Sequence, residues 1–340
     1  MDIQKKDMNI KTETMKIANR KCRLYTLSNK SMNVKILSIG ATLIEINTPD
    51  RNGNLDNIIL KHNDLLSYSA NLFYFGATIG RTTGRIKNGQ IKLSDKVYQL
   101  VKNNAGNTLH GGKRGFSLVS FEEYRQYSTK DSVTLILCYE SKDLEEGYPG
   151  NLHLEVWFTL NNKNEFTIEY KANTDKETVC NISNHAYFNL NHKKSILEES
   201  LIVNANEYYD NLGGLILGKK ERVDNTPFDF RVEQKVGYAL NNPLLHVYTN
   251  GYDHLFVFND DDEHIIFKDY DSGRMMTIYS TYKACHIFNF EFKKRDSFYS
   301  GICFECQKLP YKIENDENEI VLKPNQEYDE KIVYKFDIME

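Results

Sequence analysis

The stretch Leu152-His-Leu-Glu-Val-Trp-Phe-Thr-Leu160 places an apolar residue at every second position. A period of two is typical of a β-strand that buries one face and exposes the other. A second run, Phe166-Thr-Ile-Glu-Tyr170, follows after the polar segment Asn161-Asn-Lys-Asn164, which has the composition of a solvated loop. These runs predict half-buried strands of an antiparallel sheet.

Similar runs, rich in β-branched and aromatic residues, recur along most of the chain. They are Val34 to Ile46, Val97 to Val101, Val133 to Tyr139, Leu201 to Val203, Leu255 to Phe258, His264 to Phe267, Met276 to Tyr279, Ile287 to Phe290, Glu319 to Leu322 and Ile332 to Phe336. No segment of about fifteen residues keeps an apolar period of 3.6, the helical signature. The best helix candidate, Asp64 to Tyr68, is a single turn. Many short strands with scarce helices predict an all-β fold, either a large antiparallel β-sandwich or a barrel.

The domain organisation follows from the absence of a linker in the sequence. A length of 340 residues allows two domains, but large all-β domains often exceed the usual length. The six prolines are scattered, and no Gly/Ser-rich or single-charge block interrupts the rhythm of the strands. We therefore expect one domain over residues 21–340, preceded by a loose N-terminal segment over residues 1–20.

Composition narrows the possible partners and the cellular location. The 43 basic and 47 acidic residues are interspersed and leave a net charge of −4, which provides no electrostatic footprint for nucleic acid. No apolar run approaches the length of a membrane span, and residues 1–20 lack the apolar stretch of a signal peptide. We expect a cytoplasmic protein with reduced thiols.

The pair Cys303 and Cys306 forms a lone Cys-x-x-Cys motif. A structural zinc site would need a second pair, and a redox pair would normally start a helix. The surrounding residues alternate like a strand instead, so at least some of the six cysteines are expected to be buried small hydrophobes.

Two stretches in the first third of the chain carry polar residues and glycines where strand alternation predicts apolar residues. The first, Phe75-Gly-Ala-Thr-Ile-Gly-Arg81-Thr-Thr-Gly84-Arg85, presents two arginines that could donate to the oxygens of a ligand. The second, Asn107-Thr-Leu-His110-Gly-Gly112, lets backbone approach an imidazole closely. The alternatives are a tight turn with solvated guanidinium groups and a histidine that caps a loop.

Two further stretches hold candidate groups for proton transfer. The first is Asn181-Ile-Ser-Asn-His185-Ala-Tyr-Phe-Asn-Leu190. If this stretch is a strand, it would hold the imidazole of His185 firmly enough to transfer a proton. The alternative is that His185 is a core histidine bonded to a carbonyl. In Gly301-Ile-Cys-Phe-Glu305-Cys-Gln307, a glutamate within an apolar strand suits a general base, unless an ion pair holds it. The segment Gly251-Tyr-Asp253-His254 adds a carboxylate ahead of another apolar strand.

Together these stretches resemble the aldose 1-epimerases, or galactose mutarotases, over nearly the whole chain from about Thr26 onward. Nine pieces in the same order make coincidence implausible. They are Gly40-Ala-Thr-Leu, Thr48-Pro-Asp-Arg-Asn-Gly53, Phe75-Gly-Ala-Thr-Ile-Gly-Arg81, Asn107-Thr-Leu-His-Gly-Gly112, Asn184-His-Ala-Tyr-Phe-Asn-Leu190, Thr226-Pro-Phe-Asp-Phe-Arg231, Gly251-Tyr-Asp253, Glu305-Cys-Gln307 and Leu322-Lys-Pro-Asn-Gln-Glu-Tyr328.

The resemblance implies a galactose mutarotase-like supersandwich, with a sugar-binding groove open across one sheet. It implies interconversion of the α and β anomers of free hexoses such as glucose and galactose. By motif position, Glu305 resembles the base that removes the proton of the C1 hydroxyl, and His185 the acid that protonates the ring oxygen. Arg85, His110 and Asp253 are similar to sugar-anchoring residues. Neither a metal nor an organic cofactor is implied, because side chains carry both proton transfers.

Two substrate-facing positions depart from the family pattern. Gly84 stands where the family usually has Asn, before the binding arginine, and Tyr282 stands where it often has Gln. A lost buried hydrogen bond to a sugar hydroxyl costs about 1–3 kcal/mol, which would weaken or alter substrate choice without removing the acid and the base.

Two other functions therefore stay open beside an active hexose mutarotase. One is a catalytically weak or inactive sugar-binding or regulatory protein on the same fold. The other is a mutarotase for hexose 6-phosphates, for which Lys283, or Lys113 with Arg114, would supply the positive charge. In each case we expect a small-molecule hexose as the ligand, and the preferred hexose and the choice between monomer and homodimer stay open.

Overall fold

The structure is a computed structural model that describes residues 8–191, 195–211, 215, 220–240, 242, 245, 251–260, 263–294, 297–312 and 318–340. Strands dominate these residues, and the predicted all-β fold is confirmed. Each apolar run quoted above overlaps at least one strand.

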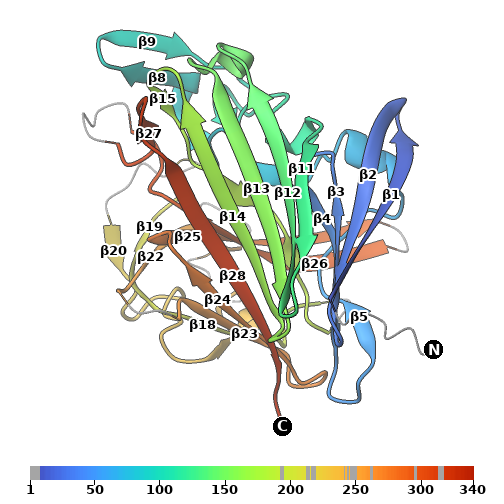
Figure 1. Cartoon of the computed structure of the whole chain (residues 1–340). Helices are drawn as coiled ribbons and strands as arrows, with labels where there is room; N and C mark the ends of the chain where they lie inside the picture. Colours follow the sequence, from blue (N-terminus) through green and yellow to red (C-terminus); the bar gives the residue numbers. More distant parts are fainter. Residues whose placement is uncertain are drawn as a thin grey trace, which may run out of the picture.

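The largest sheet in the described part of the chain has nine strands in the order β11-β12-β13-β14-β28-β24-β23-β18-β21, and neighbouring strands are antiparallel. Every second residue of β13 is buried from Leu152 to Leu160, as the alternation predicts. Figure 1 shows β12, β13, β14 and β28 side by side as long strands. The nine strands are β11 (Glu122–Ser128), β12 (Ser132–Ser141), β13 (Leu152–Asn161), β14 (Glu165–Thr174), β28 (Tyr328–Ile338), β24 (Arg274–Ser280), β23 (Ile265–Lys268), β18 (Ser200–Val203) and β21 (Gln234–Lys235).

A second sheet lies behind these long strands in Figure 1, and it contains Asp253, His286 and Glu305. As far as it is described, its order is β17-β26-β25-β22-β19-β20. Its strands are β17 (Tyr187–Phe188), β26 (Ser297–Gln307), β25 (Ala284–Lys294), β22 (Asp253–Phe258), β19 (Ala205–Tyr209) and β20 (Lys220–Arg222).

A third sheet comes from the N-terminal part of the chain and corrects one prediction. It contains, in order, β1 (Asn9–Ile17), β2 (Arg20–Ser28), β3 (Asn33–Leu37), β4 (Thr42–Pro49) and β5 (Leu55–Asn57). The segment 1–20 was expected to be loose, but β1 pairs with β2 along its whole length. Exposed polar residues concealed this strand, since its stability comes from backbone hydrogen bonds and from buried Ile17 rather than from an apolar face. Residues 1–7 of the same prediction lie outside the described residues.

Short elements connect the sheets. Asp64 accepts hydrogen bonds from the backbone N–H and the hydroxyl of Ser67, and it thereby starts a 3₁₀ turn where a single helical turn was predicted. The short paired strands are β6 (Thr78–Ile79) with β16 (Ser183–Asn184), β7 (Arg85–Ile86) with β10 (Thr108–Leu109), β8 (Gln90–Leu93) with β9 (Lys96–Gln99), and β15 (Thr178–Val179) with β27 (Val321–Leu322). The helical pieces are η1 (Leu66–Ser69), η2 (Lys87–Gly89), η3 (Phe116–Leu118), η4 (Glu145–Gly147) and α1 (Val236–Leu240).

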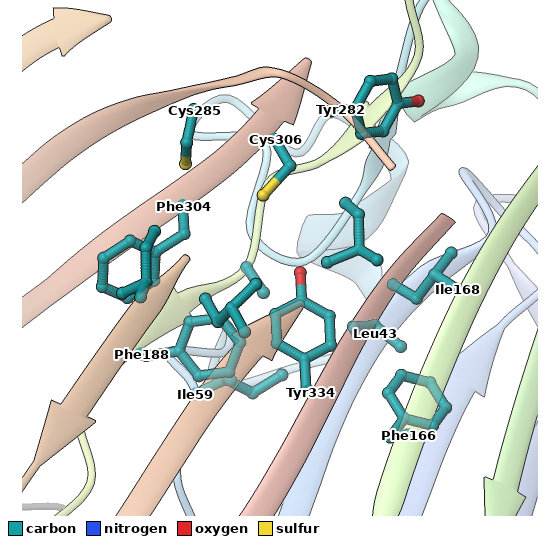
Figure 2. Close-up of a cluster of buried hydrophobic side chains, with 14 of the residues drawn as sticks. Leu43, Ile59, Phe166, Ile168, Phe188, Tyr282, Cys285, Phe304, Cys306 and Tyr334 are labelled. Carbon is teal, nitrogen blue, oxygen red and sulfur yellow. The ribbon is translucent and has the colours of Figure 1, made fainter. Parts of the chain in front are cut away.

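The main hydrophobic core joins residues from the large sheets and from β2 to β4. Phe188 of β17 lies with its ring centroid 5.3 Å from that of Tyr334 of β28, which connects the second sheet to the first. Figure 2 shows this cluster, with Phe304 and Cys306 of β26 pointing into it. All six cysteines are free thiols. Among the described residues, no helix has the length and apolar character that crossing a membrane would require.

Candidate active site

One pocket brings six of the seven predicted site residues together. Gly84, Arg85, His110, His185, Asp253 and Glu305 all line it. Strands β7, β22 and β26 contribute Arg85, Asp253 and Glu305. Gly84 directly precedes β7, His110 directly follows β10, and His185 lies between β16 and β17. The other described residues that line the pocket are Leu72, Phe73, Tyr74, Leu109, Tyr187, His286, Phe288, Phe290, Gln307 and Pro310.

The alternation of β26 separates the groups of the pocket from those of the core. Glu305 and Gln307 line the pocket, whereas Phe304 and Cys306 belong to the hydrophobic core (Figure 2). This follows from the period of two, since adjacent residues of a strand point to opposite faces. The register of β25 with β26 places His286 directly opposite Glu305, so that both side chains stand on the pocket face.

Glu305 and His185 lie beside each other and are almost fully buried. Their Oε1 and Nε2 atoms are 3.3 Å apart, and the side chains are 4% and 5% exposed. The other carboxylate oxygen of Glu305, Oε2, accepts a hydrogen bond from the hydroxyl of Thr83 at 3.2 Å. The backbone of His185 is held on both sides, because its N–H donates to Ala77 O and its carbonyl accepts from Gly76 N–H.

Burial lowers the pKa of His185, since the charged imidazolium loses its hydration, and the adjacent Glu305 carboxylate opposes this effect. The net direction is below the ordinary value of 6.5. A neutral imidazole therefore predominates at neutral pH, and its protonated form is a stronger acid than a solvated imidazolium.

His110 occupies a tight turn that fixes which of its nitrogens faces the pocket. Its backbone N–H donates to Gly84 O, and its Nδ1 accepts the N–H of Gly84 at 3.2 Å. Burial, together with the positive fields of neighbouring groups, places the pKa of His110 well below 6.5. A neutral imidazole whose Nδ1 is an acceptor carries its proton on Nε2. His110 thus offers a hydrogen-bond donor at Nε2.

The two histidines and Glu305 also form a cluster with the composition of a metal site, since their potential ligand atoms lie within 4.8 Å of one another. A metal needs the Nε2 lone pair of His110, and that would move the proton to Nδ1, where it would meet the N–H of Gly84. The hydrogen bonding of His110 therefore does not fit a metal ion and suits binding of a polar ligand.

Asp253 is paired with His286, a pocket residue that the sequence analysis missed. His286 Nε2 lies 2.6 Å from Asp253 Oδ1. Burial opposes both charges, but this hydrogen bond and the mutual attraction outweigh it, so the pKa of Asp253 is lowered and that of His286 raised. A signal existed in the sequence, since His286 has the same parity as Phe288 in the predicted strand Ile287 to Phe290 and so shares its face.

The two arginines of the Gly-rich stretch serve different purposes. Arg81 is 2% exposed, and its guanidinium donates to backbone carbonyls, among them Pro149 O and Gly150 O, and to the Ser141 hydroxyl. It is therefore a structural residue rather than a ligand-binding one. Arg85 lines the pocket, and its Nε donates to Asn104 Oδ1 at 3.0 Å.

Gly84 leaves open space beside a buried acceptor. A Cβ at this position would find Gln307 Oε1, at 4.0 Å, as the one described atom within 4 Å. Gln307 is 1% exposed, and this oxygen has no hydrogen-bond partner within the described residues. Gln307 Oε1 can therefore accept a hydrogen bond from a ligand that enters the space beside Gly84.

Tyr282 differs from its prediction as a substrate-facing residue, because it is 2% exposed and is not among the described residues that line the pocket. Its hydroxyl donates to Ile182 O at 2.5 Å and lies 2.7 Å from the hydroxyl of Tyr328. Tyr328 in turn accepts the N–H of Ile182. The two phenols thus satisfy the peptide groups at the start of the segment that carries His185.

Comparison with known proteins agrees with this geometry. A sequence model of the family described as aldose 1-epimerase matches residues 23–335. Human galactose mutarotase is 32% identical over 330 residues, which cover 92% of this chain and 94% of the relative, and maltose epimerase from Levilactobacillus brevis is 28% identical with the same coverage. The crystal structure of galactose 1-epimerase from Lactobacillus acidophilus superposes with a TM-score of 0.87 at 27% identity and covers 98% of this chain and 100% of that one. The chain belongs to the aldose 1-epimerase family.

Proposed function

We propose that the protein is an isomerase that interconverts the α and β anomers of free hexoses, with Glu305 as the general base and His185 as the general acid. The observation that carries the proposal is the 3.3 Å approach of Glu305 Oε1 to His185 Nε2 inside the pocket. In a cyclic hexose, the C1 hydroxyl and the ring oxygen are bonded to the same carbon. A base for one and an acid for the other must therefore lie close together.

The proton transfers balance without any other reactant. Glu305 takes the proton of the C1 hydroxyl, and the electrons of that O–H bond form the C1=O double bond. The bond between C1 and the ring oxygen breaks, and the ring oxygen takes the Nε2 proton of protonated His185, which becomes neutral. The free aldehyde turns about the C1–C2 bond, and both transfers then run in reverse to close the ring on the other face.

The remaining polar groups of the pocket suit the binding of an uncharged polyol. His110 offers its Nε2–H, Arg85 a guanidinium, and Asp253 a carboxylate held by His286. We infer that these groups fix the sugar so that C1 faces Glu305, since correct placement contributes much of the rate of such reactions.

The two alternatives receive less support. Lys113, Arg114 and Lys283, which would bind a phosphate, are not among the described residues that line the pocket. A non-catalytic sugar-binding protein has no need of a carboxylate and an imidazole beside each other, and the 3.3 Å distance between Glu305 and His185 therefore favours an enzyme. We further infer a cytoplasmic location from the six unpaired thiols.

Polarimetry tests the reaction and its substrate class together. Freshly dissolved α-D-galactose, α-D-glucose and maltose should each approach anomeric equilibrium faster with protein than without it. Maltose is included because a relative is named maltose epimerase. Acceleration confined to hexose 6-phosphates would overturn the choice of substrate, and sugar binding without acceleration would establish the non-catalytic alternative.

A further inference from the structure

The Cys-x-x-Cys motif is divided between two environments. Cys306 faces the hydrophobic core, whereas Cys303 has the same parity as Glu305 and packs with Phe75 and Tyr187 beside the pocket. Register places Cys303 opposite Tyr187 of β17, two residues after His185. The motif is therefore neither a thiol pair nor a ligand pair, and Cys303 is free to act alone.

Cys303 contacts the side of the His185 ring that faces away from the base. Its Sγ lies 3.5 Å from His185 Nδ1, while Nε2 of the same ring lies 3.3 Å from Glu305 Oε1. Cys303 is fully buried. Among the described side chains, its Sγ is the atom that lies in hydrogen-bond contact with His185 Nδ1.

We propose that Cys303 is a positioning residue whose sulfur accepts the Nδ1–H of His185 and so directs Nε2 at the sugar ring oxygen. This inference rests on the proposed function, because it assigns to His185 the role of acid. The thiol sets the orientation and the tautomer of the ring without touching the substrate.

The proton transfers of the proposed reaction require one particular tautomer of the His185 ring. Protonated His185 carries a proton on each nitrogen, and it gives the Nε2 proton to the ring oxygen. The neutral ring that remains must keep its proton on Nδ1, so that Nε2 has a lone pair with which to recover the proton at ring closure. An acceptor at Nδ1 favours this tautomer over the opposite one.

Sulfur differs from the usual partner of a catalytic imidazole. A carboxylate at the back of the ring raises the pKa, as Asp253 does for His286. A thiol is a weak acceptor without charge, and burial keeps it so by raising the pKa of Cys303 well above 9.0. The ring of His185 is thus oriented while its protonated form remains a strong acid.

The test compares Cys303→Ala with Cys303→Ser, since serine retains an acceptor and alanine does not. Cys306→Ala is the matched control, because it removes the same atoms from the opposite face of the same strand. Loss of an outer partner of a catalytic histidine typically costs about 10–100-fold. We expect Cys303→Ala to lose this much in kcat with KM changed less than about threefold, and both Cys303→Ser and Cys306→Ala to stay near the wild-type kcat.

Nitrogen-15 NMR of the histidine side chains supplies a readout that a loss of packing would not move. At a pH where His185 is neutral, the wild type should carry the proton on Nδ1, and Cys303→Ala should shift the population toward Nε2. A wild-type ring protonated on Nε2 would overturn the inference. So would a Cys303→Ala variant with wild-type kcat, or a Cys303→Ser variant as slow as Cys303→Ala.

The variant His185→Asn separates this inference from the function on which it rests. If His185→Asn is inactive while Cys303→Ala is unimpaired, the thiol has no positioning role and the proposed function stands. If His185→Asn keeps the wild-type rate, the assignment of the acid fails, and the inference fails with it.

Discussion

Three imidazoles from the described part of the chain line the pocket, and two of them have opposite surroundings. His185 is backed by a thiol and has a lowered pKa, whereas His286 is bonded to Asp253 and has a raised one. Burial disfavours the charge of both rings; the hydrogen bond to Asp253 outweighs this effect at His286, whereas the attraction of the Glu305 carboxylate does not outweigh it at His185. In the proposed mechanism, the group that releases its proton readily serves the ring oxygen, and the group that retains its proton holds the carboxylate proposed to anchor the sugar.

Replacing His286 should reveal this difference in the pH dependence of stability. A histidine whose pKa is raised in the folded state adds stability that is complete below about pH 6.5 and is lost as the pH rises through the folded pKa. The difference in free energy of unfolding between wild type and His286→Phe should therefore be larger at about pH 6 than at about pH 9. It should be larger by about 1.4 kcal/mol for each unit by which the pKa of His286 in the folded state exceeds its pKa in the unfolded state. Urea unfolding at both pH values measures it, and a pH-independent difference would contradict the ion pair.

Gly84 offers a test of substrate binding at one position. Asn is among the residues that tolerate a positive φ such as the +70° of Gly84, and the space there is open. An amide at this site could bond both a sugar hydroxyl and the unpartnered Gln307 Oε1. We expect Gly84→Asn to lower KM for galactose by up to about tenfold with little change in kcat. Gly84→Ala, which adds only a methyl group, is the control, and a higher KM for Gly84→Asn would show that the space is needed by the sugar.

At the level of elements, the loop that carries His110 lies with the backbone of Gly111 directly against that of Gly80. A Cβ on Gly111 would lie 1.7 Å from Gly80 O, so this turn tolerates no side chain. The predicted proximity of backbone and imidazole is thus present, with Gly84 rather than Gly111 as the partner of the ring.

A pair of alanine substitutions tests the close approach of Gly111 to the carbonyl of Gly80. Gly106 and Gly111 have φ values of +85° and +89°, but a Cβ on Gly106 would meet no described atom within 4 Å. Gly106→Ala should cost about 1 kcal/mol of stability from backbone strain alone, whereas Gly111→Ala should cost about 3 kcal/mol or more. Denaturant unfolding gives both values, and equal losses would mean that the loop moves freely away from Gly80.

Strand periodicity predicted which elements exist better than it predicted how they are paired. The alternation around Leu152 and around Glu305 correctly indicated β13 and β26. The bond between His286 and Asp253 depends on the register of β22 with β25, and no local pattern specifies that register. Tyr282 was predicted to face the substrate from its position in the family pattern, whereas its hydroxyl bonds Tyr328, a residue 46 positions further along the chain.

At the scale of the whole molecule, the pocket draws on segments from Leu72 to Pro310. The family resemblance brought distant residues into one predicted site, and the pocket contains all of them except Tyr282. The hydrophobic core likewise extends from Met8 to Phe336. We propose that the chain folds as one domain, because neither the core nor the pocket is confined to one part of the sequence.

The proposed mechanism depends most on Glu305 as the base, and one measurement tests this role directly. The rate of α-D-galactose mutarotation is followed by polarimetry for the wild type and for Glu305→Gln, while calorimetry verifies that the variant still binds galactose. Glutamine keeps the size of the side chain but cannot take the proton, so we expect a rate about 10²–10⁴-fold lower with binding retained. A Glu305→Gln variant that turns over galactose at the wild-type rate would contradict the proposed mechanism.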